Sequence, residues 1–145
     1  MEANFSVKDV QAIVNRPPTS IQYLIDQVLP PHGAKGKKRL FSMADAVLIV
    51  AAQTLFDRGF KAPAACALAK AAGEHFEALL LDDDADRWIF AAPHGDGFVF
   101  TATADAAEGL SIIEAVPDAH VINVRRMLHE AMERILDATG GKTDA

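Results

Sequence analysis

The chain has 145 residues, of which half are hydrophobic, so it can form one compact domain or a small head with a small second unit. Its single cysteine, Cys66, excludes an intramolecular disulfide. No secretion signal or membrane-length apolar run is visible, so we expect a cytoplasmic protein. The formal net charge of −6 is uneven: residues 1–73 hold nine Lys/Arg and five Asp/Glu (+4), and residues 74–145 hold five and fifteen (−10). A basic first half suggests a polyanionic partner, although local imbalance in an acidic protein is the simpler alternative.

Two short helices are expected at the start of the chain, Phe5–Asn15 and Pro18–Gln27. Ser6 can cap the first, with Asp9 as its capping-box partner, and Asn15 suits its end. The prolines that follow forbid a helix there and form the turn between the two helices. Both segments carry apolar residues at helical spacing: Val7, Val10, Ile13, Val14, Ile21, Leu24, Ile25 and Val28.

A cationic loop with two glycines, His32–Arg39, follows the second helix, and Arg39–Phe41 is typical of a short return strand. Ser42 then caps a helix over Ser42–Arg58, again with an acidic residue, Asp45, at the third position. This helix is apolar almost all round, so we expect it to be buried on more than one side.

A fourth short helix is predicted over Ala64–Ala72, with Pro63 at a first helical position and Gly73 at its end. The composition changes after Gly73, which predicts a boundary between two units there. Glu74–Leu81 fits either a helix or a strand, and the acidic run Asp82–Asp86 fits a solvated turn.

Two strand-like runs, Arg87–Ala92 and Phe98–Thr103, are joined by Pro93–Gly97, which predicts a β-hairpin. Ala104–Ala115 is ambiguous between helix and strand, and Val121–Ala138 predicts a helix. Together the elements predict an α+β fold, mainly α. A winged helix-turn-helix head that binds DNA spans residues 1–73. A small acidic unit with a hairpin and a C-terminal helix spans residues 74–145, and we expect it to serve dimerisation, contact with a protein partner or sensing.

The order and spacing of short motifs in the first half resemble the winged head of MerR-type transcriptional regulators. These motifs are Phe5-Ser6-Val7-Lys8-Asp9-Val10, Pro18-Thr19-Ser20-Ile21-Gln22-Tyr23, Leu29-Pro30-Pro31, Arg39-Leu40-Phe41-Ser42, Asp45 and Gly59-Phe60. The resemblance implies that the second helix enters the major groove. It also implies that Gln22 and Tyr23 occupy the place of a backbone-gripping Arg-Tyr pair, and that Arg39 touches phosphate. Gln22 lacks the positive charge with which an arginine would bind phosphate, and Val28 stands near the position of the glycine that is usual in the family. A divergent, excisionase-like protein is therefore an alternative.

The residue types also favour DNA contact by themselves. Small polar side chains on the second helix can donate and accept at base edges, and cations on a loop can follow the phosphates. Arg16 is either a phosphate contact or an exposed turn residue, and the loop lysines form either a wing or a solvated turn. The predicted DNA-binding residues are Arg16, Thr19, Ser20, Gln22, Tyr23, Lys35, Lys37, Lys38 and Arg39.

The second half shows no motif of catalysis. Five histidines lack metal-ligand spacing, and no phosphate-binding glycine loop or nucleophile elbow is visible, so we expect no enzyme activity, cofactor or metal. Trp88, Phe90, Phe98 and Phe100 alternate with smaller residues. They predict one aromatic sheet face that packs on a helix. The more specific alternative is that they line a ligand pocket.

The last predicted helix carries an apolar stripe that we interpret as a dimerisation surface, since a helix-turn-helix protein commonly reads two half-sites as a dimer. The predicted dimer residues are Val124, Met127, Leu128, Ile135 and Leu136, flanked by Arg126, Glu130, Glu133 and Arg134. Packing of this stripe on the hairpin within one chain is the alternative.

The sequence therefore predicts a homodimeric, sequence-specific DNA-binding regulator of transcription. One alternative is an architectural or recombination accessory factor that bends DNA. Another is a protein-interaction adaptor that has lost DNA binding and works through its acidic half.

Overall fold

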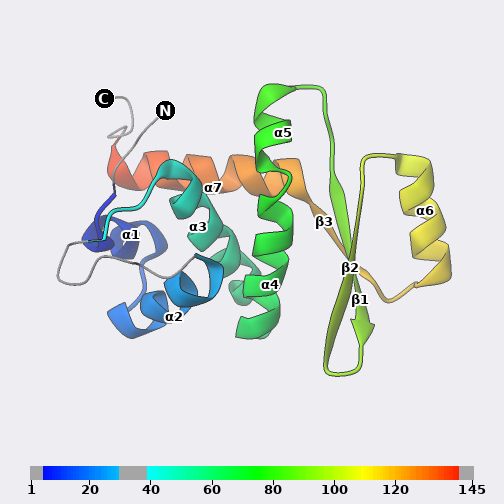
Figure 1. The fold of residues 1–145 in the computed structure, drawn as a ribbon, viewed down its shortest axis with the longest axis horizontal. Coiled ribbons are helices and arrows are strands. Elements are labelled where there is room, and N and C mark those ends of the chain that lie inside the picture. Colours follow the sequence, from blue (N-terminus) through cyan, green and yellow to red (C-terminus); the bar gives the residue numbers. More distant parts are fainter. Residues whose placement is uncertain (1–4, 30–38, 141–145) are drawn as a thin grey trace.

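The computed structural model describes residues 5–29 and 39–140, which form an α+β fold, mainly α, with one small antiparallel sheet (Figure 1). In chain order the described elements are α1 (Val7–Val14), α2 (Pro18–Val28), α3 (Met43–Asp57), α4 (Ala62–Gly73), α5 (Phe76–Leu81), β1 (Trp88–His94), β2 (Gly97–Thr103), α6 (Ala106–Ala115), β3 (His120–Asn123) and α7 (Val124–Thr139). The fold class predicted from the sequence is confirmed. No helix in the described ranges has the length and apolar character needed to cross a membrane.

Side-chain caps begin α1 and α3 where the sequence predicts them. At α1 the Ser6 hydroxyl accepts from the Asp9 N–H at 3.2 Å, and the Asp9 carboxylate accepts from the Ser6 N–H at 2.9 Å. Ser42 and Asp45 repeat this exchange at 3.1 and 3.0 Å. α1 ends at Asn15, whose φ of 53° lies in the left-handed region that asparagine tolerates. Both capping boxes are therefore confirmed.

The predicted return strand is reduced to a single antiparallel bridge in the described part of the chain. Phe5 and Phe41 exchange two backbone hydrogen bonds of 2.8 Å, and both rings are buried. This bridge joins the start of the chain to the residue before α3. The predicted wing between them falls largely on residues 30–38, which lie outside the described residues.

The sheet has the strand order β2-β1-β3, with both pairs antiparallel. The predicted hairpin is confirmed, with a tight turn at Gly95–Asp96 in which Gly95 has a φ of +59°. The helix predicted to begin at Val121 instead begins at Val124. The preceding residues pair with β1 as a third strand, and the Asn123 side chain caps α7 by accepting from the Arg126 N–H at 3.0 Å. The two ambiguous segments, around α5 and α6, are helical.

The four aromatic residues predicted to share one sheet face lie on both faces. Phe90 is paired with Thr101, whereas Phe100 is paired with Ala91, so the pleat turns the aromatic side chains of β1 and β2 in opposite directions. Phe90 packs under α6, where a Cβ on Gly109 would come within 3.1 Å of its ring. The prediction of a single aromatic face is therefore wrong.

One continuous core crosses the boundary predicted near Gly73. It contains Ile13 of α1 and Ile49 of α3 together with Leu128 and Ile135 of α7. In Figure 1, α7 runs from the sheet back across α3 to α1, while α6 lies on the far side of the sheet. The second half therefore completes the core of the first.

The predicted dimerisation stripe belongs to this core. Val124, Met127, Leu128 and Ile135 are buried within the single chain, and only Leu136, at 38% exposure, faces solvent substantially. The expectation that the stripe forms an exposed face is therefore corrected. α1, α3 and α5 cover it, and α7 also contacts β3 of the sheet.

Candidate nucleic-acid interface

The exposed face of α2 gathers four of the predicted DNA-binding residues. The apolar positions of this helix, Ile21, Leu24, Ile25 and Val28, are buried against the core. At the intervening positions Thr19, Ser20, Gln22 and Tyr23 are exposed, together with Asp26 and Gln27. The helical period therefore separates a packed side from a polar side that can enter a groove.

The beginning of α2 suits an anion. Pro17 is its N-cap and makes no side-chain cap hydrogen bond, and the first turn holds no acidic residue. Because Pro17 and Pro18 have no backbone N–H, the donors at this helix start are the N–H groups of Thr19 and Ser20, from which a phosphate oxygen can accept. Thr19 and Ser20 lie in this first turn, next to the position such a phosphate would take.

Gln22 is held by a neighbour on the same helix. Its Nε2 donates to Asp26 Oδ1 at 2.9 Å, one turn further along α2. This contact restrains the amide on the exposed face. Asp26 adds an acceptor that matches the amino group of cytosine, and its negative charge disfavours close phosphates. Asp26 was not among the site residues predicted from the sequence.

Arg16 forms an ion pair within the chain. Its guanidinium donates to the Asp57 carboxylate at the end of α3, and Asp57 also accepts from Gln53 Nε2 at 2.9 Å. The turn between α1 and α2 is therefore tied to α3. A phosphate would have to compete with Asp57 for Arg16. Neither of the two roles that the sequence suggested for Arg16 includes this ion pair.

Arg39 lies where the chain returns to the core. Its guanidinium carbon is 5.4 Å from the centroid of the Phe41 ring, within the range of a cation–π interaction. Arg39 is half-buried and Phe41 is fully buried. The remaining predicted cations, Lys35, Lys37 and Lys38, lie outside the described residues.

Arg134 of α7 supports the interface from behind, and sequence reasoning missed this role. Its Nε and Nη2 atoms each donate at 3.1 Å, to the carbonyl oxygens of Ile13 and Val14. These carbonyls end α1, where helical hydrogen bonding leaves acceptors unsatisfied and the helix dipole favours a cation. Arg134 therefore fixes the end of α1, next to the turn that leads into α2.

The described residues offer little covalent or metal chemistry. Burial raises the pKa of the Cys66 thiol, and the nearby charge of Lys70 opposes this shift. The thiol is therefore protonated at neutral pH and a poor nucleophile. Within residues 5–29 and 39–140, no group of three or more His, Cys, Asp and Glu side chains is arranged to hold a metal ion.

Comparison with known proteins gives no independent assignment. No model of a known protein family matches the chain, and no curated protein is significantly similar to it.

Proposed function

We propose that this protein is a sequence-specific DNA-binding regulator of transcription that acts in the cytoplasm. The observation that carries the proposal is the division of α2 into a buried apolar side and an exposed polar side that begins at an uncapped helix end. In this role Thr19, Ser20 and Gln22 contact base edges in the major groove. Tyr23 and the first turn of α2 bind the phosphates beside them.

The phosphate contacts of this proposal come mainly from the predicted wing. Lys35, Lys37 and Lys38 supply the charge, and Arg39 supplies a cation at the base of the loop. Such contacts give affinity without sequence choice. The excess of acidic residues in positions 74–145 disfavours a second, unspecific contact of that half with DNA.

A homodimer remains part of the proposal, but α7 is not its surface. Exposed apolar side chains instead surround the sheet face on which α6 lies: Val99, Leu110, Ile113 and Val121 are between 40% and 63% exposed. A pair of chains joined there would carry two copies of α2, as recognition of two half-sites requires. Light scattering on the full chain measures this state.

Selection of bound sequences from a random DNA pool tests the function directly. A DNA-binding regulator enriches a defined site, and its affinity falls steeply as salt rises because bound cations release counterions. Salt-dependent binding to DNA without base preference would favour an architectural factor. Absence of both enrichment and salt dependence would leave the adaptor interpretation and overturn the proposal.

A further inference from the structure

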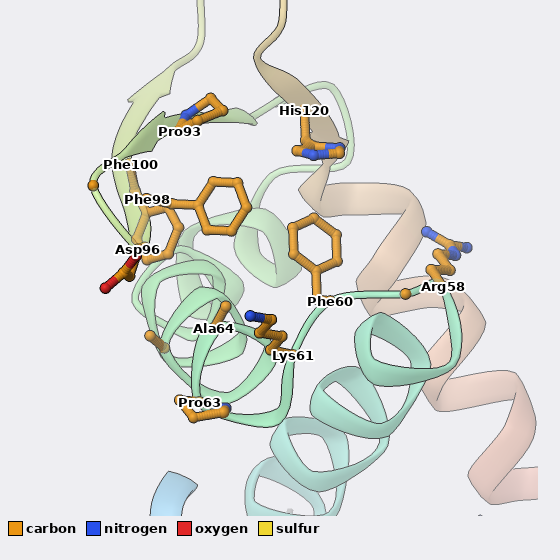
Figure 2. A pocket seen from close by; sticks show the side chains of 14 residues that line it. Arg58, Phe60, Lys61, Pro63, Ala64, Pro93, Asp96, Phe98, Phe100 and His120 are labelled. Carbon is orange, nitrogen blue, oxygen red and sulfur yellow. The ribbon is translucent and has the colours of Figure 1, made fainter.

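A groove separates the DNA-binding half from the hairpin. It has a volume of about 630 Å³ and lies between the α3–α4 connection, the first turns of α4, the tip of the hairpin and the start of β3 (Figure 2). This volume is in the range of small-molecule sites, which are concave and mostly apolar with a few polar groups.

Three aromatic rings form the groove's centre. Phe60 lies 4.9 Å from His120 and 5.6 Å from Phe98 between ring centroids, and Phe98 lies 5.6 Å from His120. The rings are inclined to one another by 60° to 70°, so none is stacked flat on its neighbour. Figure 2 shows them converging from the α3–α4 connection, β2 and β3. All three rings line the groove, so the ring surface that they present there can pack against a planar aromatic guest.

The charges at the rim are asymmetric. Arg58 and Lys61 stand on the α3–α4 side, and Asp96 stands at the tip of the hairpin (Figure 2). Arg58 donates to Glu130 at 3.3 Å, which partly neutralises it. Lys61 is exposed and forms no ion pair with a carboxylate of the described residues. One uncompensated cation beside an aromatic cluster complements one anionic substituent.

We propose that this groove binds a small planar aromatic carboxylate, with its ring packed against the cluster of Phe60, Phe98 and His120 and its carboxylate toward Lys61. Asp96 restricts the ligand to a compact anion, since a larger polyanion would reach its negative charge. The proposal is independent of DNA binding. It concerns a surface formed by the second half of the chain together with the α3–α4 segment.

The test uses the full-length protein with 2-naphthoate as the probe and its neutral amide, 2-naphthamide, as the matched compound. We expect saturable binding of 2-naphthoate in calorimetry, with a Kd of about 1 mM or lower for a ligand of this size. In an NMR titration the resonances of Phe60, Phe98 and His120 should shift together. The amide should bind more weakly.

Paired variants assign the site. Phe98→Ala should abolish binding, whereas Thr101→Ala should not, because Thr101 also lies on β2 but points to the opposite face. Phe98→Leu, which keeps an apolar side chain without a ring, replaces Phe98→Ala if the latter unfolds. Lys61→Ala should weaken 2-naphthoate about tenfold and leave the amide unchanged. Lys70→Ala, further along α4, is its control.

Three results would overturn the proposal. The first is no binding of 2-naphthoate at millimolar concentration. The second is equal loss in the Phe98 and Thr101 variants. The third is an unchanged affinity of Lys61→Ala for 2-naphthoate, which would remove the carboxylate from the recognition.

Discussion

Gln22 stands where the resemblance to MerR-type heads implies an arginine. An arginine there would hold a phosphate, but the Gln22 amide has no charge and is restrained by Asp26 on the exposed side of α2. In a major groove a glutamine can bind adenine through two hydrogen bonds. In the proposed function, Gln22 therefore contributes sequence choice and not general affinity.

Replacement of this side chain tests that interpretation. We expect Gln22→Ala to relax preference at one or two base pairs and to weaken binding to the selected site by roughly 1–3 kcal/mol. Gln22→Arg should instead raise affinity for all sequences and steepen the salt dependence by about one phosphate contact. Both are measured by random-site selection and by titrations at several salt concentrations. Unchanged base preference in Gln22→Ala would remove this residue as a reader.

Cys66 gives a pH dependence of known sign. Burial raises the pKa of its thiol in the folded state, so above the ordinary thiol pKa of 9.0 the unfolded chain loses this proton before the folded chain does. Stability is fully present below that pH and falls as pH rises toward the folded-state pKa. We expect the free energy of unfolding of wild type to decrease more steeply above pH 9 than that of Cys66→Ala. Urea titrations at several pH values measure it, and parallel slopes would contradict it.

Two arginines of α7 act on backbone carbonyls that lie far away in the sequence. Arg134 binds the end of α1, and Arg125 donates to the carbonyl oxygens of Asp82 and Ala85 at 2.6 Å and of Leu79 at 3.3 Å. The acidic turn after α5 therefore surrounds the Arg125 guanidinium with backbone carbonyls, and the Asp86 carboxylate lies 4.0 Å from Arg125 Nε as an ion-pair partner. α7 therefore orders both the first helix and the segment before the sheet.

The loss of one of these contacts has a defined cost. Arg134→Ala removes two charge-assisted hydrogen bonds, so we expect it to lower the free energy of unfolding by about 2–3 kcal/mol. Arg126→Ala is the matched control on the same helix. Its side chain is 78% exposed and binds only Glu130 among the described side chains, so its effect should stay within about 0.5 kcal/mol. Equal effects in urea unfolding would show that Arg134 does not stabilise the end of α1.

Elements with local signals were predictable, and those fixed by distant partners were not. Ser6 and Ser42 predict the starts of α1 and α3 because a capping box spans only four residues and can be recognised locally. The strand at His120–Asn123 was missed because only its pairing with β1 makes it a strand, and its residues continue the apolar pattern of α7. The aromatic faces were misassigned because the register across the hairpin depends on the turn, which the alternation within each strand does not encode.

The candidate sites follow the same division. The exposed face of α2 was predictable because the helical period alone decides which of its residues are polar and outward. The engagement of Arg16 by Asp57 and the support from Arg134 depend on chain segments more than forty residues away. The groove required Phe60, Phe98 and His120 to converge from three segments, and their spacing along the chain carries no common signal.

At the scale of the molecule, the two halves share one core, so the first half should not be stable alone. A chain truncated after Gly73 would expose the sides of α1 and α3 that α7 covers and would lose the contacts of Arg134. We expect it to melt at a lower temperature and less cooperatively than the full chain, as measured by circular dichroism. A truncated chain with the cooperativity and melting temperature of the full one would show that the head is self-sufficient.

The contact between α7 and the end of α1 also bears on how the protein is made. The carbonyl oxygens of Ile13 and Val14 accept hydrogen bonds from Arg134, which is synthesised more than one hundred residues after them. During translation the first helices therefore stay incompletely packed until Arg134 and the rest of α7 have emerged from the ribosome. Before that point a nascent chain lacks the contact that fixes the end of α1, next to the turn into α2. A chain whose synthesis stops early therefore does not form the complete surface that presents α2.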